Sequence, residues 1–201
     1  MSPRNLFASV VAPIAAGAVL VGVFLTLSAA PARPQPATFE ATDVTGVPWG
    51  REFHLTGHDG KPHELAEFRG KVVALYFGYT RCPDVCPLTL ATLGQGIERL
   101  GEDGRRVQVV FVTVDPKRDK PKVLAKYVQS FHEGFLGLYG NATETARAAD
   151  EFKVEAGEHH SVPVFLIDPN GRLRLVAHPE TSAESFAHDM RELLLENWQA
   201  G

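Results

Sequence analysis

Two nearly continuous apolar runs, each followed by a helical pattern, constrain the fold of this chain most strongly. The runs are VVALYFGY at residues 72–79 and VQVVFVTV at residues 107–114. Apolar runs without polar alternation are typical of strands that are covered on both faces. The first run leads into a helix from about Pro87, whose apolar face consists of Leu90, Leu93, Ile97 and Leu100. The second leads into a helix whose apolar stripe consists of Val123, Leu124, Tyr127, Val128 and Phe131.

Hairpin and helix patterns complete the alternation around these runs. Phe53 and Leu55 alternate with polar residues ahead of a HDGK turn, which predicts an N-terminal hairpin. A second hairpin is expected around the DPNG turn at residues 168–171, after a short helix from about Thr143. The closing helix is expected to turn four residues inward: Phe186, Met190, Leu193 and Leu194. This order predicts an α/β fold with a mixed central sheet and helices on both of its faces.

The first thirty residues predict a separate, membrane-directed segment. Between Leu6 and Ala30 the chain contains no charged residue, Asn or Gln, and this run of 25 residues is long enough to span a bilayer. Arg4 and the amino terminus are expected to stay in the cytoplasm, which places the chain from about Pro31 on the far side. The alternative is a signal peptide cleaved near SAAPA. The anchor interpretation predicts a single-pass protein of the inner membrane with its soluble domain in the periplasm.

A short linker and one folded domain follow the predicted anchor. Residues 31–39 are rich in proline and are expected to form an extended spacer, and residues 40–201 are expected to form the domain. The net charge of the chain is −4. Nucleic-acid binding requires clustered cations, so this balance argues against a nucleic-acid partner.

The only two cysteines, Cys82 and Cys86, lie directly after the first predicted strand. Open α/β sheets place their sites at the carboxyl ends of such strands, and a cysteine pair at this point makes the expected fold thioredoxin-like. Their spacing puts both on one side of a first helical turn, where the sulfur atoms can converge. Helix-end amides and Arg81 favour thiolates, although Asp84 opposes this. Flanking prolines and polar turn residues argue against two deeply buried core thiols.

A thiol pair of this kind can exchange disulfides, bind a metal, or alternate between the two. Thiol oxidoreductases of this architecture usually have two residues between the cysteines, whereas this chain has three, PDV, which favours a metal. His159 and His160 precede the predicted strand at residues 164–167 and offer a third ligand. Neighbouring residues of an extended chain point in opposite directions, so one of the two is expected to face the cysteines. Sulfur with imidazole suits copper in either oxidation state, or zinc.

Three motifs resemble, in order and spacing, those of the Sco/SenC family of membrane-anchored copper proteins. They are YFGYTRCPDVCP, VTVDPKRDKP and HHSVPVFLIDPNG, and the resemblance covers roughly residues 46–196. It implies that Cys82, Cys86 and His160 are the copper ligands. Cu(I) is the expected form, and Cu(II) stays open.

Two further positions are implied beside these ligands. Asp115 matches an acidic residue near the copper site of the family. The family usually has Asp directly before the ligand histidine, where this chain has His159. Asp115 and His159 are therefore expected next to the metal, and His159 is the alternative to His160 as the coordinating imidazole.

The resemblance also implies a function, a partner and a location. Members of this family assist assembly of the dinuclear copper centre of cytochrome c oxidase. The chain is therefore expected to be a metallochaperone rather than an enzyme, delivering copper to subunit II of the oxidase. Two alternatives stay open: a thiol-disulfide reductase that keeps the copper-site cysteines of the oxidase reduced, and a redox or copper sensor. A periplasmic copper donor or thiol reductant is a further expected partner.

Other polar residues leave alternatives open. Pro163 is either a cis-proline facing the cysteine loop or an ordinary strand-start proline. Arg118 is expected to pair with Asp119 or with Asp115 and so shape the site. Three histidines near the first hairpin are either a second metal site or solvated turn residues: His54, His58 and His63.

Overall fold

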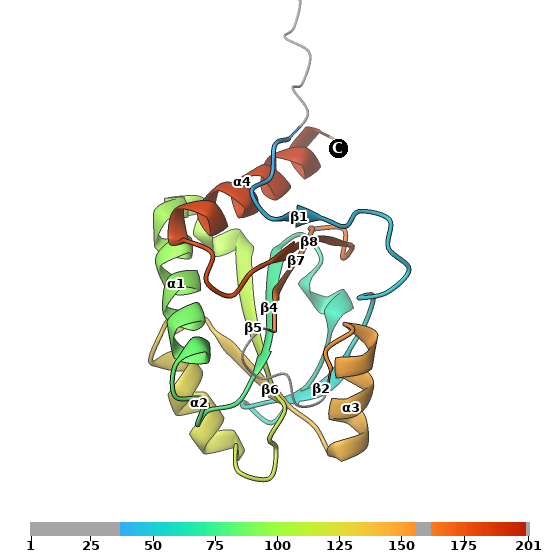
Figure 1. Ribbon diagram of the computed structural model, residues 1–201, viewed down its shortest axis with the longest axis vertical. Helices are drawn as coiled ribbons and strands as arrows, with labels where there is room; N and C mark the ends of the chain where they lie inside the picture. The colour runs from blue at the N-terminus through green and yellow to red at the C-terminus, as the bar shows by residue number, and fades with distance from the viewer. Residues whose placement is uncertain (1–36, 156–161, 200–201) are drawn as a thin grey trace, which may run out of the picture. The chain divides into compact units, whose positions relative to one another are not determined.

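A computed structural model describes residues 37–155 and 162–199 of the chain. The described residues form one eight-stranded sheet with helices packed against it (Figure 1). The strands are β1 (Thr42–Asp43), β2 (His54–Gly57), β3 (Pro62–Glu64), β4 (Val72–Gly78), β5 (Val107–Thr113), β6 (Leu136–Tyr139), β7 (Val164–Ile167) and β8 (Leu173–Ala177). The helices are α1 (Val85–Leu100), α2 (Pro121–Gln129), α3 (Ala142–Glu151) and α4 (Ala183–Gln199), with short 3-10 helices at Leu65–Phe68 and Gly101–Arg106.

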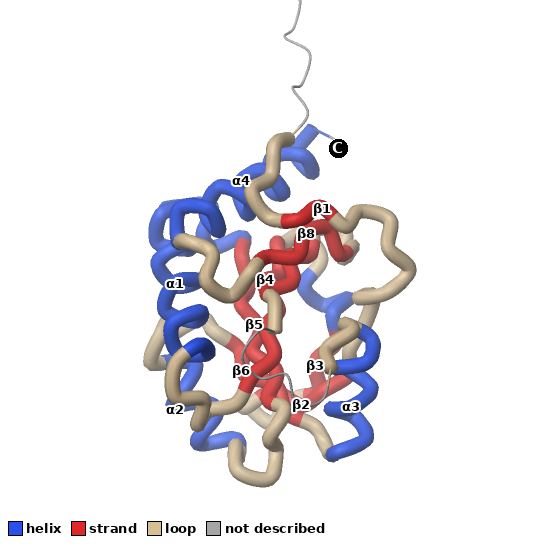
Figure 2. The backbone as a smooth tube through the Cα atoms, in the orientation of Figure 1, coloured by secondary structure: helices blue, strands red, loops and turns tan. Residues whose placement is uncertain are grey.

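The sheet is mixed, as predicted. Its strand order is β1-β8-β7-β4-β5-β6-β2-β3, so the two apolar runs form neighbouring central strands (Figure 2). Strands β4, β5 and β6 run parallel, whereas β7 lies antiparallel to β4 on its other side. The parallel connections pass through α1 and α2, which cover the sheet.

Adjacent residues of β4 show that helices cover both faces of the sheet. Tyr76 points toward α1, where its hydroxyl contacts Cys86. Phe77 points to the opposite face, where its ring centroid lies 5.8 Å from that of Phe152 at the end of α3. Figure 1 shows α1 and α2 on one side of the central strands and α3 on the other. The predicted thioredoxin-like α/β fold is therefore confirmed.

Helices α1 and α4 pack closely on each other through the predicted apolar faces. All eight residues expected to point inward from the first and last helices are buried. Gly96 allows the approach, because a Cβ atom there would lie only 3.3 Å from atoms of Phe186 and Met190. The stripe expected on the second helix is wrong at Val123, whose side chain is 48% exposed. The helix α2 is short and packs inward through Leu124 and Val128, which lie four residues apart.

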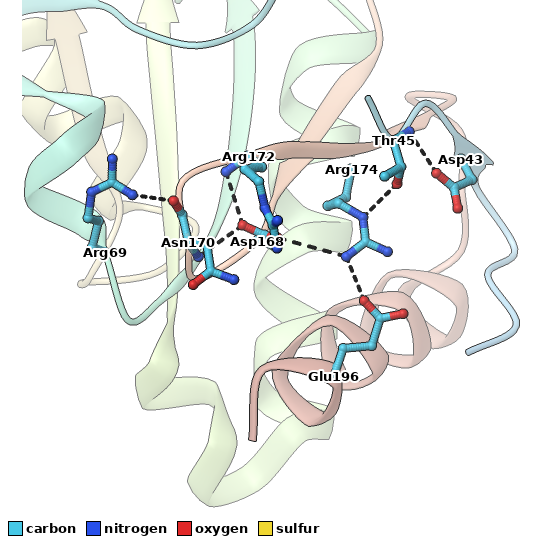
Figure 3. A network of polar contacts seen from close by, with 8 residues as sticks. All are labelled: Asp43, Thr45, Arg69, Asp168, Asn170, Arg172, Arg174 and Glu196. Carbon is cyan, nitrogen blue, oxygen red and sulfur yellow. Dashed lines mark hydrogen bonds and ion pairs between the residues drawn. The ribbon is translucent and has the colours of Figure 1, made fainter. Parts of the chain in front are cut away.

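Both predicted hairpins are present. Strands β2 and β3 pair antiparallel around the HDGK turn, and β7 pairs with β8 around the DPNG turn. Asp168 is fully buried in the second turn and accepts hydrogen bonds from the backbone N–H groups of Asn170 and Arg172. Figure 3 shows how Arg174 continues this network from β8 to Glu196 on α4, at 2.5 Å, and to Thr45 beyond β1, at 2.6 Å. Arg174 also lies 3.8 Å from Oδ2 of Asp168, so this network connects the turn with α4 and with the segment after β1.

No helix among the described residues is long and apolar enough to cross a membrane. The anchor or signal predicted for residues 1–30 lies outside the described ranges, as does most of the predicted linker. The membrane anchor and the domain boundaries therefore stay predictions.

Candidate metal centre

The cysteine loop connects the end of β4 to the start of α1. The backbone N–H of Cys82 donates to the carbonyl of Tyr79, at 3.1 Å, and closes a turn. Cys86 lies in the first turn of α1, and its N–H donates to Sγ of Cys82 at 3.3 Å. Neither cysteine forms a disulfide. The predicted convergence of the two cysteines at the carboxyl end of a central strand is confirmed.

Both thiols are more deeply buried than the sequence indicated. Cys82 is 5% exposed and Cys86 is fully buried, so the argument from prolines and polar turn residues was wrong. The reason is the direction of the first turn of α1, which points Cys86 into the core between the helix and the sheet. Gly78 makes this possible, because a Cβ atom at that position would lie 2.8 Å from Sγ of Cys86.

The two thiols differ in acidity. Burial raises the pKa of Cys82, but hydrogen bonds from Cys86 and from the backbone N–H groups of Asp84 and Val85 outweigh it, and the net pKa lies below the ordinary value. Burial raises the pKa of Cys86 to about 12, and the hydrogen bond with Cys82 adds to the rise. The predicted thiolate bias is therefore confirmed for Cys82 and wrong for Cys86. The amides at the start of α1 stabilise only the sulfur that faces them.

Two tyrosines border the buried side of the pair. The hydroxyl of Tyr76 donates to Sγ of Cys86 at 3.7 Å. The hydroxyl of Tyr127, on α2, is buried and has no hydrogen-bond partner among the residues that the structure describes. Its pKa is raised by burial and then by the nearby sulfur atoms of Cys86 and Cys82. Such a hydroxyl is costly, so a polar group would be favourable at this position.

The loop after β5 brings two carboxylates to the same end of the sheet. Asp115 forms an ion pair with Arg118, so this one of the two predicted pairings is confirmed. Asp119 does not contact Arg118; its side chain turns inward, is 1% exposed, and accepts hydrogen bonds from Thr80 and Thr113. The loop therefore presents one partly exposed carboxylate, Asp115, and one buried carboxylate, Asp119, which contacts the cysteine loop through Thr80.

The imidazole predicted as third ligand falls on undescribed residues. His159 and His160 lie outside the described ranges, so the choice between them stays a prediction. Among the residues that the structure describes, no group of three His, Cys, Asp or Glu side chains is arranged to hold a metal. Strand β7 begins at Val164, which pairs with Tyr76 of β4. The start of β7 therefore lies beside the carboxyl end of β4, from which the cysteine loop leaves.

Pro163 fits the ordinary interpretation. No cis peptide bond occurs in the described part of the chain, and this proline directly precedes β7. It acts as a strand-start proline, a position where no ladder hydrogen bond is lost.

The three histidines of the first hairpin do not converge on one point. His63 lies between Glu67, at 2.5 Å, and Asp59, at 3.1 Å. His58 accepts a hydrogen bond from the backbone N–H of Gly137, and His54 is an exposed member of β2. His54 matches the solvated interpretation, whereas His63 and His58 have structural contacts that the sequence did not predict.

Sequence reasoning did not identify Gly78, Tyr76, Tyr127 or the role of Asp119. The glycine and Tyr76 are part of an apolar strand pattern, which does not reveal which residue faces the thiols. Tyr127 was assigned to an apolar helix stripe. The DPKRD sequence marked the loop as relevant, but only the fold shows which of its two carboxylates turns inward.

Comparison with known proteins gives a consistent result. The family model SCO1/SenC matches residues 42–195. The human protein called Protein SCO2 homolog, mitochondrial, is 38% identical over 189 residues, which cover 87% of this chain and 71% of that protein. Apo Sco1 from Thermus thermophilus has a TM-score of 0.66 and 37% identity, covering 82% of this chain and 99% of the other. ScoI from Bradyrhizobium japonicum, solved with copper bound, has a TM-score of 0.63 and 30% identity, covering 71% and 98%.

Proposed function

Because this chain belongs to the SCO1/SenC family, we propose that it is a copper chaperone. It binds copper through Cys82, Cys86 and His160 and delivers it to the dinuclear copper centre of cytochrome c oxidase subunit II. Residues 1–30 anchor it in the inner membrane, with the domain in the periplasm, where it meets the oxidase at the same membrane surface.

The thiol pair carries this proposal. Cys82 and Cys86 form no disulfide, Sγ of Cys82 lies 3.3 Å from the backbone nitrogen of Cys86, and both residues have the soft donor atoms that copper prefers. The copper bound to a structural relative with 30% identity supports the same cargo.

The unequal thiols suit a protein that must release what it holds. Cys86 is fixed in the core by Tyr76 and by the close approach of Gly78. Cys82 lies nearer the surface, in a loop, and is the sulfur from which a partner can take over the cargo. Two sulfurs and one imidazole leave a coordination position for an incoming thiolate of the partner, so the partner can bind the copper before the ligands of this chain dissociate.

A thiol-disulfide reductase is the second candidate, and the same asymmetry favours it. A more acidic outer thiol beside a buried partner is the arrangement of an attacking and a resolving cysteine. In that reaction Cys82 attacks the substrate disulfide and releases one substrate thiolate. Cys86 then attacks Sγ of Cys82 in the mixed disulfide and releases the second thiolate, so the substrate receives two electrons and two protons as the pair forms its own disulfide.

Replacement of His160 separates the two functions. For the reduced full chain we expect His160→Ala to weaken Cu(I) binding strongly while the rate of reduction of a small aromatic disulfide stays within about twofold. The control is His54→Ala, since this exposed histidine lies in the β2–β3 hairpin at one edge of the sheet, away from the central strand β4 that leads to the cysteines. Unchanged copper affinity in His160→Ala, or equal weakening in His54→Ala, would contradict the three-ligand site.

A further inference from the structure

A buried carboxylate ties the cysteine loop to the neighbouring strand. Asp119 is 1% exposed, although it lies in a loop rich in charged residues. The adjacent cation, Arg118, pairs with Asp115 instead. A buried carboxylate is costly unless donors replace the water it has lost. The donors that surround Asp119 therefore indicate what the carboxylate is for.

All three of these donors belong to the ends of the two central strands. Oδ1 of Asp119 accepts from the hydroxyl of Thr80, at 2.6 Å. Oδ2 accepts from the backbone N–H of Thr80, at 2.9 Å, and from the hydroxyl of Thr113, at 2.6 Å. The hydroxyl of Thr113 in turn accepts from the N–H of Asp115, at 3.0 Å. The carboxylate thus bridges the last residue of β5 and the first turn of the cysteine loop.

This bridge lies where the strand ladder has ended. Gly78 and Thr113 are the last paired residues of β4 and β5, and Val114 donates one more bond to the carbonyl of Gly78. Beyond that point no strand pairing among the described residues holds the loop. Thr80 stands two residues before Cys82, inside the turn that Cys82 closes on Tyr79. Fixing Thr80 therefore fixes the approach of Cys82 to Cys86.

The chemistry of the bridge favours a carboxylate. Three donors converge on two oxygens, and a carboxylate can accept all of them because it carries no hydrogen. An asparagine of the same shape has one oxygen, and its amide nitrogen would face a threonine hydroxyl, which would have to rotate and accept instead of donate. Substitution by Asn therefore preserves volume while replacing the charge-assisted hydrogen bonds of the carboxylate with weaker neutral ones.

We propose that Asp119 is a positioning residue that holds the cysteine loop in the arrangement in which Cys82 and Cys86 bind copper together. It acts through Thr80 and does not touch the cargo itself. For copper this inference rests on the function proposed above, whereas the effect on the loop is independent of copper.

Asp119→Asn in the full chain tests the proposal against a matched variant, Asp189→Asn. Asp189 is also 1% exposed and accepts two backbone N–H bonds, from Glu40 and Ala41, but it lies on α4. We expect Asp119→Asn to weaken Cu(I) affinity about tenfold, or 1.4 kcal/mol, at equal folded fraction, and Asp189→Asn to leave it within about twofold. Equal effects of the two variants on copper affinity would overturn the proposal.

Amide hydrogen exchange in the copper-free protein distinguishes a local change in the cysteine loop from a general loss of stability. We expect faster exchange selectively at Thr80 and Cys82 in Asp119→Asn, whereas a uniform increase throughout the sheet would overturn the positioning role. If the parent chain binds no copper, the proposed function fails, and this exchange pattern still decides the role of Asp119.

Variants of Thr80 provide the second test, and those that keep Asp119 remain available if Asp119→Asn folds poorly. Thr80→Val removes one donor, and Thr80→Ser restores it and should recover parental copper affinity. Thr80→Val should cost much less in the Asp119→Asn background than in the parent, because both changes break the same contact. Additive effects, or failure of Thr80→Ser to recover affinity, would contradict the bridge.

Discussion

Alkylation of the reduced protein should strike Cys82 far faster than Cys86. At about pH 8, a thiol with a pKa of about 12, such as Cys86, is ionised in about one molecule in 10,000. An ordinary thiol with a pKa of 9.0 is ionised in about one in ten, and the pKa of Cys82 lies below that ordinary value. The thiolate populations therefore differ roughly 1,000-fold. The more basic thiolate is intrinsically more nucleophilic, with a Brønsted coefficient of about 0.4–0.5. Each Cys86 thiolate therefore reacts roughly 15- to 30-fold faster, which offsets part of the difference in population. The net preference for Cys82 is roughly 30- to 60-fold.

The assay treats the copper-free, reduced full chain with limiting iodoacetamide under anaerobic conditions and locates the label by peptide mass spectrometry. The preference should disappear in denaturant, where both thiols are solvated and lie in the same peptide environment. The rate at Cys82 should rise with pH to a plateau reached below the pH expected for an ordinary thiol. Equal labelling in the folded protein, or faster labelling of Cys86, would refute the assignment of an outer, acidic thiol and a buried, basic one.

Three further perturbations follow from particular contacts. Gly78→Ala places a Cβ atom 2.8 Å from Sγ of Cys86, so overpacking should lower the free energy of unfolding by roughly 1–3 kcal/mol and weaken Cu(I) binding. Denaturant titration measures the first effect and competition with a Cu(I) chelator the second. No change in either quantity would contradict the close approach. Tyr127→Phe removes the unpaired hydroxyl and should leave the copper-free protein as stable as the parent or about 1 kcal/mol more stable, and a clear loss would indicate a partner for that hydroxyl. Burial lowers the pKa of His63, but the contacts with Glu67 and Asp59 raise it by more than burial lowers it, so the net pKa lies above 6.5. The stabilisation from protonated His63, less than about 1 kcal/mol, is therefore complete below about pH 6.5 and is lost as the pH rises through the folded-state pKa. A curve of stability against pH that His63→Gln leaves unaltered would contradict this contribution.

Hydrophobic periodicity predicted the central elements of the fold because those elements are buried in a regular way. The runs that became β4 and β5 are apolar on both faces, and α1 and α4 each bury a single stripe. Strand β6 was missed, since it has only four residues and contains Gly137. That glycine is required by contact with α2, where a Cβ atom would lie 2.6 Å from Leu124. A requirement of this kind depends on tertiary packing and leaves no periodic signal.

The site was predictable in its position and only partly in its chemistry. The C-x3-C spacing after a strand located Cys82 and Cys86, because strand ends and helix starts have fixed geometry. Their burial and unequal acidity depend on which way the first turn of α1 faces, and the sequence does not contain that direction locally. The same limit applies to Asp119, whose partners lie 39 and 6 residues away along the chain.

The copper content of the reduced full chain tests the central claim most directly. Cu(I) is added anaerobically to the parent and to the Cys82→Ser/Cys86→Ser variant, weakly bound metal is removed with a competing chelator, and copper per chain is measured. The proposed chaperone site predicts about one copper per parent chain and none in the double variant. Copper retained by the double variant would place the metal elsewhere, and a parent chain that holds no copper would contradict the copper function itself.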